Sequence, residues 1–266
     1  MDCSFIVNED EAGKRVDLVL AARMCSGYSR SFIQRLILNK AILLNKLPIK
    51  SNHKVNIGDN IKVAQPEGRG TLPAPEKISL RVIHEDSDII VIDKPCGLVV
   101  HPAVGNQTGT LVNALLSHTK NLSSVNPKRP GIVHRLDKET SGVMVAAKNN
   151  ASHLNLARQF ASHNVRKKYI ALVCGVMEFD EGVIDLPIGR HRADFRRKGV
   201  TFVNSRQALT RYKVLRRLDN ATLLELAPET GRTHQLRVHL SHLGHPIIGD
   251  TVYGKPGLLN RLALHA

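Results

Sequence analysis

The chain has 266 residues and carries 38 Lys and Arg against 23 Asp and Glu, which gives a formal net charge of +15. This excess favours a polyanionic partner, because phosphate contacts release counterions, and nucleic acid is the first candidate. An anionic membrane surface is the competing partner, but no long amphipathic helix with basic flanks is predicted. The longest apolar runs are far short of the ~20 residues that cross a bilayer, and the amino terminus is too acidic for a signal peptide. We therefore expect a cytoplasmic protein with no membrane partner.

Residues 1–64 are predicted to form a small α/β module. Val16, Leu18 and Val19 lie near one face of its first predicted helix. The predicted elements are helices over residues 14–24 and 31–40, with Ser29 as the N-cap of the second, and strands over residues 41–44 and 61–64. Residues 65–76 contain prolines and glycines but hardly any large apolar side chain, so we expect them to form a linker.

The motifs RVDLVL, YSRSFIQRLI, ILLNKLPI and VNIGDNIKV follow one another over residues 12–64. This pattern resembles the S-four-like RNA-binding domain, which a small-subunit ribosomal protein shares with several RNA-modifying enzymes. In that family the second helix and the adjoining loop present basic residues to structured RNA. The resemblance implies RNA contacts from Ser29, Arg30, Arg35 and Lys40. Without the resemblance, the same residues could form a solvated basic face.

Residues 77–266 are predicted to form a larger domain. Its predicted strands cover residues 80–83, 89–92, 166–176, 211–215 and 222–226, and its predicted helices cover residues 111–118, 151–162 and 232–243. Between residues 190 and 206, several arginines and Lys198 stand against one acidic residue, Asp194. We expect this segment to be a long hairpin loop that contacts phosphates.

The most unusual stretch covers residues 131–149, where a charged insert interrupts a buried strand pattern. The insert includes His134, Arg135 and Asp137. Burying a carboxylate costs several kcal/mol unless a cation or donors compensate, so such interruptions are often found at sites that do chemistry. Asp137 is therefore the first catalytic candidate. On composition alone, Arg135 and Asp137 could instead belong to a solvated turn.

The insert reads HRLDKETSG and resembles the signature of the ribosomal pseudouridine synthase family of the RluA and RluD type, whose aspartate is the nucleophile. Three further motifs of that family follow the same order in this chain. They are IDKPCGLVVHP before the insert, Arg166-Lys167-Lys168-Tyr169 with the tyrosine 32 residues after Asp137, and ETGRTHQLRVHL followed by GHPIIGDTVYG. Together the motifs span about 170 of the chain's residues.

The resemblance implies an α+β chain with the pseudouridine synthase fold, a mixed and mainly antiparallel sheet with flanking helices and a central cleft. It implies an isomerase that converts specific uridines to pseudouridine in structured RNA, with large-subunit (23S) ribosomal RNA as the expected substrate. A tRNA pseudouridine synthase of the same family and a non-catalytic RNA-binding or ribosome assembly factor are the alternatives. We expect a monomer with no cofactor or metal. The family usually continues beyond the position of Ala266, so we expect the catalytic domain of residues 77–266 to be truncated.

The resemblance also assigns catalytic roles. Asp137 would attack C1′ of the ribose or C6 of the base, and Arg237 would pair with Asp137 to keep it ionised. Tyr169 would stack on the uracil and assist loss of the C5 proton, and Arg135 would enter the gap left by the flipped nucleotide. The expected RNA contacts of this domain are His134, Arg166, Lys167, Arg190, Arg192, Arg196, Arg197, Lys198 and Arg232.

Three rival sites are disfavoured by spacing. His234 and His239 would point in different directions on a helix, and no Cys, Asp or Glu completes a metal-binding set with them. GDTVYGKP is a near miss for a phosphate-cradling loop, because Pro256 stands where a Ser or Thr is needed. His134, Asp137 and Ser141 lie too close together in the chain for a hydrolase triad, and no nucleophile elbow is present. The four cysteines have no CxxC spacing and predict neither a zinc ribbon nor a disulfide framework.

Overall fold

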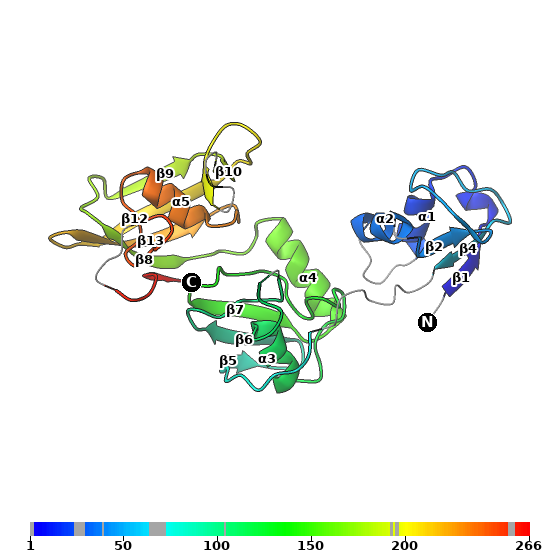
Figure 1. Ribbon diagram of the computed structural model, residues 1–266, viewed down its shortest axis with the longest axis horizontal. Coiled ribbons are helices and arrows are strands. Elements are labelled where there is room, and N and C mark those ends of the chain that lie inside the picture. Colours follow the sequence, from blue (N-terminus) through cyan, green and yellow to red (C-terminus); the bar gives the residue numbers. More distant parts are fainter. Residues whose placement is uncertain are drawn as a thin grey trace. The chain divides into compact units, whose positions relative to one another are not determined.

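The computed structural model describes residues 3–23, 30–38, 40–63, 73–103, 105–191, 194, 197–254 and 259–266. The chain divides into two compact units, Met1–Leu72 and Pro73–Ala266 (Figure 1). Each unit has a hydrophobic core of its own.

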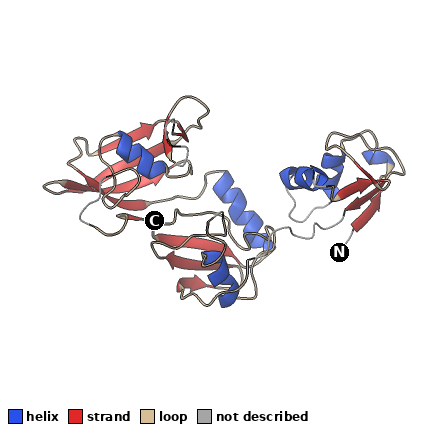
Figure 2. Ribbon diagram, viewed as in Figure 1, coloured by secondary structure: helices blue, strands red, loops and turns tan. Residues whose placement is uncertain are grey.

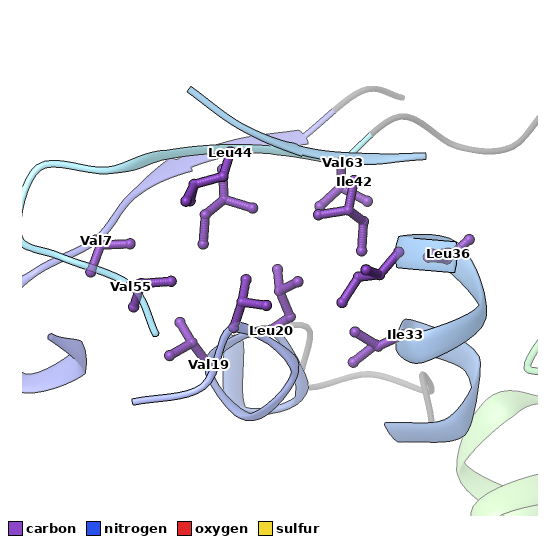
Figure 3. Packing of buried hydrophobic residues seen from close by; sticks show 12 residues of the cluster. Val7, Val19, Leu20, Ile33, Leu36, Ile42, Leu44, Val55 and Val63 are labelled. Atoms are coloured by element: carbon purple, nitrogen blue, oxygen red, sulfur yellow. The ribbon is translucent and has the colours of Figure 1, made fainter. Parts of the chain in front are cut away.

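The first unit combines two short helices with a four-stranded antiparallel sheet. Its elements are β1 (Cys3–Ile6), the 3-10 helix η1 (Glu9–Glu11), α1 (Val16–Arg23), α2 (Arg30–Leu38), β2 (Ile42–Leu44), β3 (Leu47–Pro48) and β4 (Asn60–Val63). The strand order is β1-β4-β2-β3. Figure 3 shows the core of this unit, where side chains of α1 and α2 meet those of the sheet.

The buried face of α1 differs from the predicted one. Val16, Val19 and Leu20 are buried, whereas Leu18 is 43% exposed. Because α1 begins at Val16, these three residues have the i, i+3, i+4 spacing of a single helical stripe. Asp17 is also buried and accepts hydrogen bonds from Arg15 and Gln34, which offset the cost of burying its charge.

The second unit contains a three-stranded sheet and a five-stranded sheet, both antiparallel within themselves. Its helices are α3 (Leu111–His118), α4 (Asn150–Ala161) and α5 (Gln235–His242). Its strands are β5 (Arg81–Glu85), β6 (Ile89–Lys94), β7 (Gly142–Ala147), β8 (Tyr169–Cys174), β9 (Glu181–Asp185), β10 (Ile188–Arg190), β11 (Lys198–Val200), β12 (Leu209–Arg217), β13 (Ala221–Pro228) and β14 (Leu264–His265). The orders are β5-β6-β7 and β14-β8-β13-β12-β9, while β10 and β11 form a separate hairpin.

The chain's last residues join the two sheets. On one side β14 pairs antiparallel with β8. On its other side it meets residues 141–143, through a parallel bridge between Ser141 and His265 and a hydrogen bond from Val143 N to Ala266 O. Gly142 allows this approach, since a Cβ there would lie only 2.4 Å from backbone atoms of Ala266. The expected mixed and mainly antiparallel sheet is thereby confirmed.

Helices pack against both parts of this sheet. Leu236 and Leu240 of α5 are buried against the five-stranded part, which α5 crosses in Figure 2. α3 packs against the three-stranded part through Leu111 and Leu115. α4 begins after Asn149, whose side chain caps the helix by accepting from Ser152 N. The packing of α4 and α5 positions residues that line a cavity in the second unit.

Candidate active site

A cavity of about 560 Å³ opens where the two parts of the sheet meet. Its walls come from the charged insert before β7, the end of α4, the start of β8, the segment between β13 and α5, and the last residues of the chain. The four predicted catalytic residues, Asp137, Tyr169, Arg237 and Arg135, all line it. Segments more than 90 residues apart in the sequence thus contribute to one site.

Asp137 lies on a loop that a buried lysine holds in place. The carboxylate is partly exposed, and its neighbour Leu136 is buried. Lys94, at the end of β6, is fully buried and donates from Nζ to the carbonyl oxygens of Pro95, Leu98 and Lys138 at 2.8 to 3.0 Å. Burial lowers the pKa of Lys94 to about 8. The amine therefore ties the loop after β6 to the loop of Asp137.

The role of Lys94 was not predicted from the sequence. Its position in the KP-x-G part of the IDKPCGLVVHP motif was a usable signal, but in the sequence pattern the residue only ended a strand. A lysine is rarely buried completely unless it has partners, and here three carbonyl groups supply them.

His134 is half-buried and lines the cavity, where its ring contacts two neighbouring elements. Its ring stacks on Phe160 of α4 with centroids 4.6 Å apart, and its Nε2 accepts a hydrogen bond from Val145 N at 3.1 Å. Burial, and then the charge of Lys167, lower the pKa of His134 to about 4. The imidazole is therefore neutral near pH 7, and it anchors the charged insert to β7 and α4. Because His134 also lines the cavity, its expected contact with RNA stays a prediction.

Tyr169 is the first residue of β8 and lines the cavity with Asp137. Burial raises the pKa of its phenol to about 12, and the negative charge of Asp137 contributes. The hydroxyl is consequently protonated near neutral pH. Its ring also packs against two of the hydrophobic clusters, which limits its movement.

Arg237 does not pair with Asp137 as expected. Its guanidinium binds Asp250 through two hydrogen bonds, Nε to Oδ2 at 2.7 Å and Nη2 to Oδ1 at 2.8 Å. Both side chains are buried, at 5% and 0% exposed, and two parallel bonds match the planar fork of an arginine. Burial alone would lower the pKa of Arg237, but the bonds to Asp250 and the charges of Asp250 and Asp137 raise it.

Tyr253 contacts both Arg237 and His234, which line the cavity. Arg237 lies over its ring at 5.0 Å, and the Tyr253 hydroxyl is 2.8 Å from Nδ1 of His234. The same hydroxyl accepts a hydrogen bond from Lys198 N in β11. His234 adopts a left-handed backbone conformation directly before α5. The predicted helix began at Arg232, but α5 begins at Gln235, and residues 232–234 form part of the cavity wall before it.

The predicted RNA-binding residues are distributed over several places. Arg166, Lys167 and Arg232 line the catalytic cavity. Arg190, Lys198 and again Arg232 line a second cavity beside it. Arg197 turns inward instead, because its guanidinium lies over the Tyr253 ring at 5.2 Å and donates to the carbonyl of Val252.

The remaining predictions concern the α2 region and the tip of the basic hairpin. Lys40 is exposed and follows α2. Arg30 and Arg35 belong to α2, but their side chains are outside the described part of the structure. Ser29, Arg192 and Arg196 also lie outside the described residues. The expected RNA contacts of these residues stay predictions.

Membrane spans and metal-binding groups were both sought among the described residues. Across the described ranges, no helix has the length and apolar character that a bilayer span requires. Within the same ranges, no three or more His, Cys, Asp and Glu side chains gather in a way that could hold a metal ion.

Comparison with known families identifies the class of protein. The pattern of the RNA pseudouridylate synthases matches residues 88–242, and the pattern of the S4 domain matches residues 14–61. The chain belongs to the RNA pseudouridylate synthase family. It is an enzyme, an isomerase that acts on RNA, and it carries an S4 domain in its first unit.

Individual relatives agree with this assignment. An uncharacterized RNA pseudouridine synthase of Bacillus subtilis is 41% identical over 262 residues, 97% of this chain and 86% of the relative. Ribosomal large subunit pseudouridine synthase D of Nitrosomonas europaea is 44% identical over 272 residues, 98% of this chain and 77% of the relative. The solved structure of human RNA Pseudouridylate Synthase Domain Containing 1 superposes with a TM-score of 0.60 at 29% identity, covering 75% of this chain and 79% of that one. The expected family and fold are confirmed.

Proposed function

We propose that this enzyme isomerises specific uridines in large-subunit ribosomal RNA, with Asp137 as nucleophile. The observation that carries this proposal is the meeting of Asp137, Tyr169 and Arg237 on one cavity, although they come from three distant segments. The ribosomal substrate is supported by the relatives named ribosomal large subunit pseudouridine synthase D, which resemble this chain over most of its length.

The reaction needs no reagent other than the RNA. Asp137 forms a bond to C1′ or to C6, the bond between N1 and C1′ breaks, and the uracil turns until C5 faces the sugar. A bond then forms between C5 and C1′, the C5 proton leaves, N1 takes up a proton, and the bond to Asp137 breaks. Atoms and electrons balance within the nucleotide, so neither a redox cofactor nor an energy source is required.

The neighbouring side chains support Asp137 in different ways. Tyr169 stacks on the uracil, and its hydroxyl, which is protonated near neutral pH, relays the proton that C5 loses by releasing its own proton to water in the same step. Arg237, held by Asp250, places positive charge near Asp137 without occupying its carboxylate oxygens. Arg135 is exposed at the cavity and fills the space that the flipped nucleotide leaves in its stack.

The first unit serves RNA binding in this proposal. Its S4 domain holds structured RNA through the basic residues of the α2 region, and the second unit performs the isomerisation. We propose that a single chain carries out both tasks as a monomer in the cytoplasm.

The test is to map pseudouridines in RNA from a strain lacking the gene, before and after incubation with the purified protein. We predict that the wild type restores pseudouridine at positions in large-subunit ribosomal RNA and that Asp137→Asn restores none, while both bind this RNA with similar affinity. The matched control is Asp219→Asn, because Asp219 is exposed in the turn between β12 and β13, outside both cavities.

Other results would correct the proposal in defined ways. Restored sites confined to tRNA would change the substrate, and uridines left unchanged by the wild type would favour a binding or assembly role. Product formation by Asp137→Asn would remove Asp137 from the mechanism.

A further inference from the structure

A second cavity of about 660 Å³ lies beside the catalytic one. Residues 231–233 line both cavities, so a single stretch of chain separates them. The remaining walls come from β10, the start of β11 and the segment that follows β11. A cavity of this volume falls within the range that binds small ligands, such as one nucleotide.

The walls of the second cavity carry positive charge. Four cationic side chains line it, and none of its described lining residues is acidic. They are Arg190, Lys198, Arg206 and Arg232. Polar side chains of Thr201 and Asn204 add groups that can form hydrogen bonds. Such a lining complements a phosphodiester rather than an apolar ligand.

Hydrogen bonds connect the walls of the second cavity with the wall of the catalytic cavity. Lys198 N of β11 donates to the hydroxyl of Tyr253, and that hydroxyl also binds His234 in the catalytic wall. The segment after β11 returns to β10 through a pair of backbone hydrogen bonds between Ile188 and Arg206, at 2.9 and 3.0 Å. Arg190 and Lys198 are therefore positioned by strands β10 and β11, and Arg206 by its bridge to Ile188. Arg232 is held by a hydrogen bond from its Nε to Gln207 O.

The segment that follows β11 carries an exposed aromatic side chain, Phe202. Phe202 is 79% exposed and lies between Thr201 and Val203, which both line the second cavity. Two hydrogen bonds hold the turn that carries Phe202. Thr201 N donates to Pro187 O, and Val203 N donates to the Thr201 hydroxyl. Both chain neighbours of Phe202 line the basic cavity, so this exposed ring is one residue from the cavity wall. Exposed aromatic rings near cationic grooves bind single-stranded RNA, because a base stacks on the ring while its phosphate meets the charges.

We propose that the second cavity binds the nucleotide next to the target uridine, with Phe202 stacking on its base and the four cationic side chains holding its phosphate. A strand whose uridine enters the catalytic cavity places its neighbour across residues 231–233, at the second cavity. The inference rests on the proposed function for the identity of the first nucleotide. By this stacking, Phe202 favours RNA in which the nucleotide next to the target uridine is unpaired.

The first experiment measures binding without catalysis. The probe is a fluorescein-labelled decamer of uridine, and its affinity is measured by fluorescence anisotropy for the wild type, Phe202→Ala and Phe179→Ala. Phe179 is a matched control, since it is also exposed, at 64%, but lies outside both cavities. We expect Phe202→Ala to weaken binding about 5- to 100-fold, the usual effect of losing one stacked base. Phe179→Ala should bind like the wild type.

The second experiment uses a stem-loop that contains a uridine the wild type converts, with each neighbouring nucleotide made abasic in turn. At one position the missing base should lower kcat/KM for the wild type but cause little further loss in Phe202→Ala, because both changes remove the same stacking contact. Equal losses in both proteins at every position would overturn the inference.

The two experiments separate this inference from the proposed function. Normal conversion combined with unchanged decamer binding by Phe202→Ala would refute the second site and leave the function intact. Loss of decamer binding by Phe202→Ala, with no conversion of any uridine by the wild type, would refute the function and support the second site. Circular dichroism checks that each variant is folded, and the high exposure of Phe202 makes unfolding an unexpected result.

Discussion

Two buried cationic side chains, Arg237 and Lys94, lie at or near the cavity of Asp137. Arg237 donates two hydrogen bonds to the carboxylate of Asp250, and Lys94 donates three to backbone carbonyls. In each case groups other than Asp137 compensate the buried cation, so its burial is offset without occupying the Asp137 carboxylate. We infer that this arrangement leaves the oxygens of Asp137 available to the substrate.

The lowered pKa of His134 leads to a stability prediction. An unfolded imidazole has a pKa near 6.5, whereas burial lowers that of His134 to about 4 in the folded protein. Between these values the unfolded state binds the extra proton, so the stabilisation is complete above pH 6.5 and is lost as pH falls toward 4. We predict that urea denaturation shows a smaller loss of unfolding free energy between about pH 7 and about pH 5 for His134→Gln than for the wild type.

His163→Asn is the control for this measurement. His163 is exposed and has a φ of 57°, a backbone conformation that asparagine tolerates well. This variant should keep the pH dependence of the wild type. An equal pH dependence of His134→Gln and the wild type would show that His134 does not contribute through its proton.

At the scale of elements, β14 has an unusual position for so short a strand. It pairs with β8 on one side and meets the start of β7 on the other, and thereby connects the sheet that carries Lys94 with the sheet that carries Tyr169. The catalytic cavity opens along this junction and is lined by Leu264 and Ala266. The geometry of the site thus depends on how closely these backbones approach.

Replacing Gly142 by alanine should disturb this junction. Its φ is +126°, and a Cβ would lie 2.4 Å from backbone atoms of Ala266, which cannot move aside as a flexible side chain would. We predict that Gly142→Ala lowers the free energy of unfolding by about 3 kcal/mol or more and reduces kcat. The control is Gly109→Ala, since Gly109 has a φ of +66° but no atom within 4 Å of the added Cβ.

The comparison of these two glycine variants by denaturant unfolding is decisive. Gly109→Ala reports only the backbone cost, which is about 1 kcal/mol. A similar loss for both variants would show that the approach of Ala266 to Gly142 is not a tight constraint on the junction.

At the scale of the whole molecule, the net charge of +15 is the dominant feature. Binding of an RNA polyanion should therefore weaken steeply as salt is added, because each phosphate contact releases counterions. Cationic residues are placed in α2 and around both cavities of the second unit. Because the cationic residues are distributed in this way, we expect many separate phosphate contacts to contribute to the affinity for RNA.

The contribution of the first unit can be measured by this salt dependence. We predict that Arg30→Ala and Arg35→Ala each weaken binding to ribosomal RNA and reduce the slope of log K against log salt by about 1, while the conversion rate of bound RNA is retained. Lys120→Ala, an exposed lysine of the second unit outside both cavities, is the control. An unchanged slope would argue against RNA contact by α2.

The sequence predicted most elements because their apolar spacing is locally strong. α3 was placed at its observed bounds, and α4 was placed within one residue of its ends. β1, β3, β9, β10, β11 and β14 were missed, because strands of two to five residues without clear alternation are defined by their partners. β11 lies within residues 190–206, which were expected to be a loop. The start of α5 was misplaced by three residues, since helical spacing cannot reveal that His234 adopts a left-handed conformation.

The sequence by itself determined the family and the candidates Asp137, Tyr169 and Arg237, because these lie in contiguous motifs whose order can be read directly. Only the tertiary structure decided the partner of Arg237, the burial of Lys94 and the inward turn of Arg197. Each of these depends on which distant backbone or carboxylate reaches the side chain in the folded chain. Long-range contacts of this kind leave no local pattern, so packing alone determines them.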